Sequence, residues 1–127
     1  MMNSDSFKTW LDAYGRAWEN RDPQAAVKLF TADATYRETP FDETMRGREA
    51  ISEYWSNETR AQEDIKFSCE ILAVSEQKGI ARWKVSLVRI PSKSQVKFDG
   101  IFVVYFNAEN LCTVFEEWWH REETESL

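Results

Sequence analysis

Hydrophobic side chains at the start of the chain recur with the spacing of an amphipathic helix. The pattern i, i+3, i+4, i+7 and i+11 is formed by Phe7, Trp10, Leu11, Tyr14 and Trp18. Ser4 or Ser6 is expected to cap this helix. A short second helix is predicted after Asp22-Pro23, because Asp suits the cap position and Pro suits the first helical position. A third helix is predicted over 48–60.

The remaining pattern predicts strands. One strand is expected over 34–39, and Pro40 ends it. From residue 65 onward, apolar and polar residues alternate, which is typical of half-exposed strands. The later strands cover 65–71, 82–87, 96–106 and 111–121, with turns at 77–79, 91–94 and 107–110. The order of elements indicates an α+β fold, in which the helices pack on one face of a mostly antiparallel sheet.

The last two predicted strands are apolar on both faces. The face of the final strand that we assign to the interior holds Val114, Glu116, Trp118 and His120. The opposite sheet face holds Val103, Tyr105, Phe115 and Trp119. No predicted helix remains to cover this second face, so we expect a homodimer through the outer sheet face, with a monomer as the alternative.

Composition limits the kind of partner. At 127 residues the chain is expected to form a single domain over 1–127, with a frayed acidic tail at 122–127. The net charge of −6 argues against nucleic acid and anionic membranes as partners, and no segment has the ~20 apolar residues of a membrane span. The polar N-terminus lacks the apolar region of a signal peptide, and Cys69 and Cys112 are expected to be reduced core thiols. We therefore expect a cytoplasmic protein.

Aromatic residues are frequent, at 14% of the chain with six Trp. So many large rings in one small domain fill a core, line a cavity or form an interface. The rings that we expect to bind a ligand in a cavity are Tyr36, Trp55, Trp83, Phe102 and Trp118, with plain core packing as the alternative. Such walls suit a flat or cyclic hydrophobic small molecule.

Glu38 is the main candidate for chemistry because it shares a strand face with Tyr36. A carboxylate that points into an aromatic interior is costly unless it is paired, protonated or in use. We interpret Glu38 as a general base for proton transfer. The alternative is a carboxylate on the rim, paired with Arg37, Arg46 or Arg48.

Two further titratable residues lie on the strand face assigned to the interior. Glu116 would place a second carboxylate near Glu38, which suits dehydration or hydration, because one acid protonates a leaving oxygen while the other removes a proton. The alternative for Glu116 is a salt bridge to an arginine across the sheet. His120 is expected at the pocket mouth, with a surface role as the alternative. It is the only histidine, so no metal is expected, and the absence of a glycine-rich phosphate loop argues against a nucleotide cofactor.

Several segments together resemble a known superfamily. They are Asp22–Phe30, Asp33-Ala34-Thr35, Arg46-Gly47, Glu49-Ala50-Ile51 and the closing strands. The chain resembles the nuclear transport factor 2-like superfamily, and within it the SnoaL-like and ketosteroid-isomerase-like branch, over nearly its whole length. The resemblance implies a cone, in which a strongly curved sheet wraps around three helices and leaves a pocket between them. Members of this superfamily include isomerases, cyclases, dehydratases, epoxide hydrolases and binding or assembly domains, so the resemblance fixes the fold better than the function.

The resemblance also implies roles for particular residues. Glu38 matches the general base of the ketosteroid isomerases, which is an Asp there, and Tyr14 matches their oxyanion-hole tyrosine. The protonated acid that completes that hole matches Phe102, which is a departure from the family pattern. Asp99 is close in sequence but lies on the opposite strand face, unless a bulge at Gly100 turns it inward.

A second departure concerns the partner of Tyr14. The family tyrosine that hydrogen-bonds the oxyanion tyrosine is matched by Trp55, whose indole donates a hydrogen bond but cannot accept one. We therefore predict a cofactor-independent enzyme of isomerase, cyclase or dehydratase type, with Glu38, Tyr14 and Glu116 acting on a hydrophobic, cyclic substrate. The alternatives are a non-catalytic binder of small apolar ligands and a dimeric assembly domain.

Overall fold

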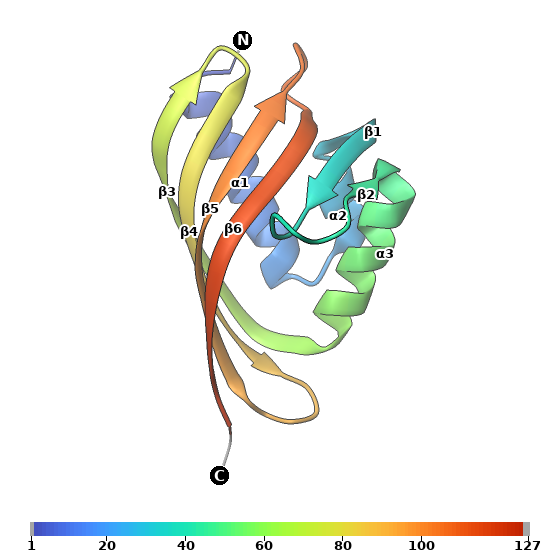
Figure 1. Ribbon diagram of the computed structural model, residues 1–127, viewed down its shortest axis with the longest axis vertical. Coiled ribbons are helices and arrows are strands. Elements are labelled where there is room, and N and C mark those ends of the chain that lie inside the picture. Colours follow the sequence, from blue (N-terminus) through green and yellow to red (C-terminus); the bar gives the residue numbers. More distant parts are fainter. Residues whose placement is uncertain (1, 126–127) are drawn as a thin grey trace.

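Three helices lie on one face of a single curved, six-stranded sheet in the computed structural model, which describes residues 2–125 (Figure 1). The helices are α1 (Ser4–Glu19), α2 (Pro23–Val27) and α3 (Gly47–Arg60). The strands are β1 (Phe30–Arg37), β2 (Met45–Arg46), β3 (Gln62–Ser75), β4 (Lys78–Arg89), β5 (Gln95–Phe106) and β6 (Cys112–Thr124). The strand order is β2-β1-β6-β5-β4-β3. Among the strands of residues 2–125, β1 and β6 form the only parallel pair. The predicted α+β fold is confirmed.

The helix starts follow from local capping chemistry. Asn3 caps α1: its side-chain oxygen accepts a hydrogen bond from the Ser6 backbone N–H at 2.8 Å, and the Ser6 hydroxyl accepts one from the Asn3 N–H at 2.9 Å. The expectation of Ser4 or Ser6 as the cap was wrong, because Ser6 is the reciprocal partner inside the helix. Asp22 caps α2 through Ala25 N–H, with Pro23 in the first turn, as predicted.

The core between α1 and the sheet is built from aromatic rings around Tyr14. The Tyr14 ring stacks on Trp10 and Phe115 at centroid distances of 5.4 and 5.3 Å. It meets Trp55 and Phe102 edge-on, both at 5.2 Å. Phe102 and Phe115 are fully buried, and Trp119 packs against the same core. The assignment of Phe115 and Trp119 to an outer dimer surface was therefore wrong.

A bulge at Thr113 sets which side chains of β6 face the core. Tyr105 pairs with Val114 and Phe106 pairs with Cys112, so Thr113 is the extra residue in β6, and its hydroxyl donates to the Tyr105 carbonyl at 3.3 Å. Cys112 and Phe115 are therefore both buried although three positions separate them. Unbroken alternation from Cys112 would have directed Val114 and Glu116 inward, and the bulge reverses this.

β5 passes through Gly100 without any bulge. Its pairing with β4 and β6 is continuous from Gln95 to Tyr105. Asp99 therefore stays on the outer face, where Arg82 donates two hydrogen bonds to it at 3.0 and 2.7 Å. Gly100 has a different role: a Cβ atom at this position would collide with the Trp118 carbonyl oxygen and with Trp119.

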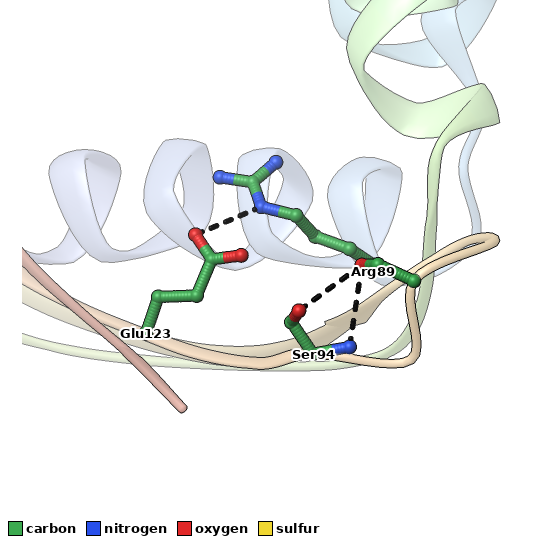
Figure 2. A network of polar contacts seen from close by, with 4 residues as sticks. Arg89, Ser94 and Glu123 are labelled. Carbon is green, nitrogen blue, oxygen red and sulfur yellow. Dashed lines mark hydrogen bonds and ion pairs between the residues drawn. The ribbon is translucent and has the colours of Figure 1, made fainter. Parts of the chain in front are cut away.

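The far end of β6 contacts the side chain of Arg89, the last residue of β4. Figure 2 shows Arg89, whose Nε donates to Glu123 at 3.2 Å and whose backbone N–H donates to the Ser94 carbonyl at 2.9 Å. Backbone pairing continues to Thr124, which lies opposite Gln95. Of the acidic tail 122–127, which we expected to be frayed, residues 122–124 are thus part of the sheet, and residues 126–127 lie outside the described residues.

Both cysteines are free thiols: Cys112 is buried and Cys69 is half-buried. Burial raises the pKa of each thiol, and it raises that of Cys112 strongly, so both favour the neutral form. None of the helices within residues 2–125 is long and apolar enough to cross a membrane.

Candidate active site

A small cavity lies between helices α1 and α3 and the inner face of the sheet. Its volume is about 50 Å³, whereas pockets for drug-sized ligands are roughly 300–1,000 Å³. The lining residues come from seven elements and the turn after β1: Tyr14, Trp18, Tyr36, Glu38, Tyr54, Trp55, Glu58, Thr59, Gln62, Trp83, Phe98, Glu117 and Trp119. Indole and phenol rings occupy most of the cone, which is why little space remains.

Glu38 lines this cavity directly after the last residue of β1, where it is half-buried. Burial raises the pKa of its carboxyl above the ordinary value of 4.5, and the charge of Glu58 acts in the same direction. A hydrogen bond from the Tyr54 hydroxyl opposes the rise in pKa, as does the more distant charge of Arg121. Glu38 therefore combines partial solvent access with a more basic carboxylate than usual.

Two of the three arginines considered as partners for Glu38 are engaged elsewhere. Arg37 forms an ion pair with Glu116 at 2.6 Å. Arg48 donates two hydrogen bonds to the backbone carbonyl of Phe30, at 2.9 and 2.6 Å. The charge of Arg121 lowers the pKa of Glu38.

Glu117 is a second carboxyl in the cavity, and it is only 4% exposed. Burial, reinforced by the charge of Glu38, raises its pKa well above the ordinary value. A protonated Glu117 is a hydrogen-bond donor inside the cavity. Sequence reasoning missed this residue, and the available signal was Cys112 together with Phe115, two strongly core-forming residues separated by an odd number of positions.

Three tyrosines line the cavity together with the two carboxyls. The hydroxyls of Tyr14 and Tyr36 are 3.0 Å apart and share a hydrogen bond. Burial raises the pKa of Tyr14, Tyr36 and Tyr54 well above the ordinary value, and the charge of Glu117 is the next largest cause for each. These phenols are therefore neutral donors, and the hydrogen-bond partner of Tyr14 is Tyr36 and not Trp55. Among the described residues the buried Trp55 N–H has no acceptor.

Glu116, predicted to face the pocket, lies instead on the outer sheet face. It is the ion-pair partner of Arg37, and each side chain is about a quarter exposed. Trp118, which is 40% exposed, lies on the same face beneath the Arg37 guanidinium, 5.8 Å from its ring centroid. His120 is also exposed. The expected placement of Glu116, Trp118 and His120 was wrong because the bulge at Thr113 reverses their direction.

The other predicted site residues are divided between cavity and core. Tyr14, Tyr36, Glu38, Trp55 and Trp83 line the cavity, as the sequence predicted. Phe102 lies behind the wall, stacked on Trp83 at 4.9 Å between centroids. Residues that line the cavity without having been predicted as site residues include Trp18, Tyr54, Phe98, Glu117 and Trp119.

The arrangement offers a base and an acid in the lining of one small cavity. Glu38, at the end of β1, is the more accessible carboxyl, and Glu117, in β6, is the more deeply buried. Two titratable groups whose environments separate their pKa values can serve as a proton acceptor and a proton donor. Among residues 2–125 there is no group of three or more His, Cys, Asp or Glu side chains placed to hold a metal ion.

Comparison with known proteins identifies the family. Residues 11–114 match the SnoaL-like domain family, and the chain belongs to that family, in the ketosteroid-isomerase-like branch of the nuclear transport factor 2-like superfamily. A curated relative, a steroid Δ-isomerase from Nocardioides simplex, is 29% identical over 116 residues, which cover 91% of each chain.

Solved structures show the same fold at lower identity. The epoxide hydrolase/cyclase-like enzyme SalBIII superposes with a TM-score of 0.81 at 21% identity, covering 94% of this chain and 95% of that one. A computationally designed 17-OHP binder superposes with a TM-score of 0.80 at 14% identity, covering 93% and 98%. At these identities the two structures show that the fold is shared.

Proposed function

We propose that this protein is a cofactor-independent enzyme that moves a proton between two carbon atoms of a small cyclic carbonyl compound. The observation that carries the proposal is the pair of carboxyls in one aromatic cavity, Glu38 half-exposed and Glu117 buried. The steroid isomerase relative supports the reaction class. The cavity volume of about 50 Å³ favours a substrate smaller than a steroid unless the surrounding indoles move.

In the proposed mechanism, the Glu38 carboxylate removes a proton from the carbon next to the substrate carbonyl. Negative charge then develops on the carbonyl oxygen, and the protonated Glu117 donates a hydrogen bond to it. Glu38, now carrying the proton, returns it to the γ-carbon, which moves the double bond into conjugation. No atom is gained or lost, so the reaction is an isomerisation.

The Tyr14–Tyr36 pair supports the acid in this proposal. Both phenols are neutral, and one of them donates to the other. The O–H that remains free in the pair can add a hydrogen bond to the developing oxyanion or to Glu117 itself. Donors that are already oriented in a dry site stabilise charge more than donors in water do. The acid of the ketosteroid isomerases would thus be replaced by one on the neighbouring strand.

The direct test uses a small β,γ-unsaturated cyclic ketone such as cyclohex-3-enone, followed through the ultraviolet absorbance of the conjugated product. We expect the wild-type protein to accelerate conversion, and we expect Glu38→Gln and Glu117→Leu each to slow it. Glu49→Gln, on an exposed position of α3 outside the cavity, is the matched control. Conversion by the wild type at the rate of buffer alone, across a panel of ring sizes, would refute this assignment.

A non-catalytic binder is the second candidate. The designed 17-OHP binder of the same fold supports this possibility, as does the number of indoles around the cavity. A binder would change its tryptophan fluorescence with apolar ligands but convert none of them. The assembly-domain alternative ranks third because the cavity is not completely filled.

We also propose that the protein forms a homodimer through the outer sheet face and resides in the cytoplasm. Half-buried Val103, Tyr105 and Val114 and exposed Trp118 give that face an apolar character. The two free thiols fit a reducing compartment. Analytical ultracentrifugation of the wild type and of Trp118→Glu tests the dimer, and a wild type that sediments as a monomer at high concentration would contradict it.

A further inference from the structure

We propose that the same cavity also binds small alkylammonium cations, which compete there with neutral carbonyl ligands. This proposal shares its site with the proposed function and rests on it to that extent, but it concerns ligand binding and not turnover. It follows from three features of the cavity: the sign of its charged groups, the aromatic character of its walls and the lack of a cation beside its buried acid.

The charged groups of the cavity wall all have the same sign. Its titratable acids are Glu38, Glu58 and Glu117, and no Lys, Arg or His is among the lining residues. Arg121, which is exposed, acts on Glu38 through its charge. An anionic ligand would therefore meet repulsion, whereas a cation would meet attraction in a place partly shielded from water.

The walls provide the second feature, since they are aromatic on several sides. Four indoles, of Trp18, Trp55, Trp83 and Trp119, come from α1, α3, β4 and β6. Alkylammonium ions bind to the faces of such rings, and aromatic cages for quaternary ammonium groups use the same attraction. The apolar methyl groups of such an ion also suit walls that would not suit a hydrated metal cation.

Glu117 provides the third feature because it is an acid without a counter-ion. Five ion pairs form within residues 2–125, and none of them includes Glu117. The two influences on its pKa are burial and the charge of Glu38, and both disfavour the carboxylate. A cation in the cavity would offset both and restore the ionised form.

Ligand charge and the protonation of Glu117 are therefore linked. The other titratable groups near this acid are Glu38 after β1, Tyr14 from α1, Tyr36 from β1, and Tyr54 with Glu58 from α3. The tyrosines stay neutral because their pKa values are raised. A cation thus binds more tightly as pH rises and releases a proton from Glu117, while a carbonyl ligand needs the protonated acid and binds more tightly at lower pH.

The test compares choline with 3,3-dimethylbutan-1-ol, which has the same shape but no charge. Binding to the wild-type protein is measured by tryptophan fluorescence and by calorimetry in two buffers of different ionisation enthalpy, from pH 5 to pH 9. We expect choline to bind at least about tenfold more tightly than the alcohol at pH 9. Choline binding should release protons, and the ratio of the two affinities should become smaller as pH falls. Equal binding of the two compounds at every pH would overturn the proposal.

Two variants of adjacent residues sharpen the result. Glu117→Gln removes the buried acid, so it should abolish the proton release at pH values where Glu38 is already ionised, and only the pH dependence due to Glu38 should remain. Glu116→Gln changes the neighbouring residue on the outer face and should leave the preference as it is in the wild type. If Glu117→Gln kept the wild-type pH dependence, the assignment to Glu117 would be wrong. Wild-type choline binding decides the proposal even where a variant fails to fold, and isomerase activity without choline binding would refute this proposal alone.

Discussion

Glu117 on β6 lies directly opposite Phe102 on β5, and both side chains point to the inner face of the sheet. Phe102 is the position where the family resemblance places the acid of the oxyanion hole. The structure thus has a buried carboxyl one strand away from the expected place, on the same face. Burial and the charge of Glu38 raise the pKa of this carboxyl, which is the electrostatic condition that a hydrogen-bond-donating acid requires.

Replacing Glu38 by Gln should remove the proposed base. We expect turnover of a β,γ-unsaturated ketone to fall by about 10²–10⁴-fold, the usual contribution of a positioned general base, with little change in KM. Steady-state kinetics measures this effect. The control is Glu116→Gln, which breaks the ion pair with Arg37 on the outer face and should leave turnover within about twofold while costing up to about 1 kcal/mol of stability. A large loss of turnover in the control would instead favour the site inferred from the unbroken strand pattern.

The pH dependence of turnover should be bell-shaped. The rate rises with pH as Glu38 loses its proton, with a midpoint above 4.5 because burial raises the pKa of this base. The rate falls at higher pH as Glu117 ionises, since the pKa of this acid is raised further. In Glu117→Gln the falling limb should disappear while part of the activity remains, because an amide N–H still donates. A profile that keeps its falling limb in this variant would exclude Glu117 as the acid.

Stability should depend on pH through Glu117. The pKa of Glu117 is higher in the folded protein than in the unfolded chain. Its contribution to the free energy of unfolding is therefore fully present below the pKa of the unfolded chain, and it is lost as pH rises through the pKa of the folded protein. Relative to wild type, Glu117→Gln should therefore gain stability above about pH 4.3, at most by about 1.4 kcal/mol for each pH unit until the folded pKa is reached. Denaturant unfolding at a series of pH values measures the difference. A constant difference from pH 4 to pH 8 would contradict the raised pKa.

Gly100→Ala should destabilise the protein and disturb the cavity. The added methyl group would meet the Trp118 carbonyl and the Cα and Cβ atoms of Trp119, so β5 and β6 would have to separate locally. Overpacking of this kind costs about 1–3 kcal/mol. Chemical denaturation gives the loss, and fluorescence reports on the Trp119 indole in the cavity wall. Gly47 offers a contrast, because a Cβ there has room beside the Ala32 carbonyl and the cost comes from its positive φ of 86°.

Much of the fold could be predicted from the sequence because the signals were local. Asp22-Pro23 gave the start of α2, and the alternation after residue 65 gave the long strands. Tyr14 could be placed in the cavity from the helical spacing of α1, and Tyr36 and Glu38 could be placed there from the alternation that follows Ala34 in β1.

The residues of β6 could not be placed in the same way. Its two faces have similar hydrophobicity, so the pattern alone did not decide which one faces the core. The face of β6 that turns toward the core is set by one unpaired residue, Thr113. This residue is recognised as extra only from the pairing of its neighbours with Tyr105 and Phe106 of β5. Such pairing depends on a second segment of the chain, so it cannot be read from the alternation of residues within β6 alone.

The bulge at Thr113 has a consequence for how such a site changes over evolutionary time. Glu116 and Glu117 are adjacent acids, and the length of the preceding backbone selects the one that enters the cavity. Deletion of a single codon there would exchange a buried acid for an ion-paired surface residue while leaving every remaining side chain unaltered. A lineage could therefore gain or lose its proton donor through an insertion or a deletion, and a comparison of aligned residue identities alone would overlook that event.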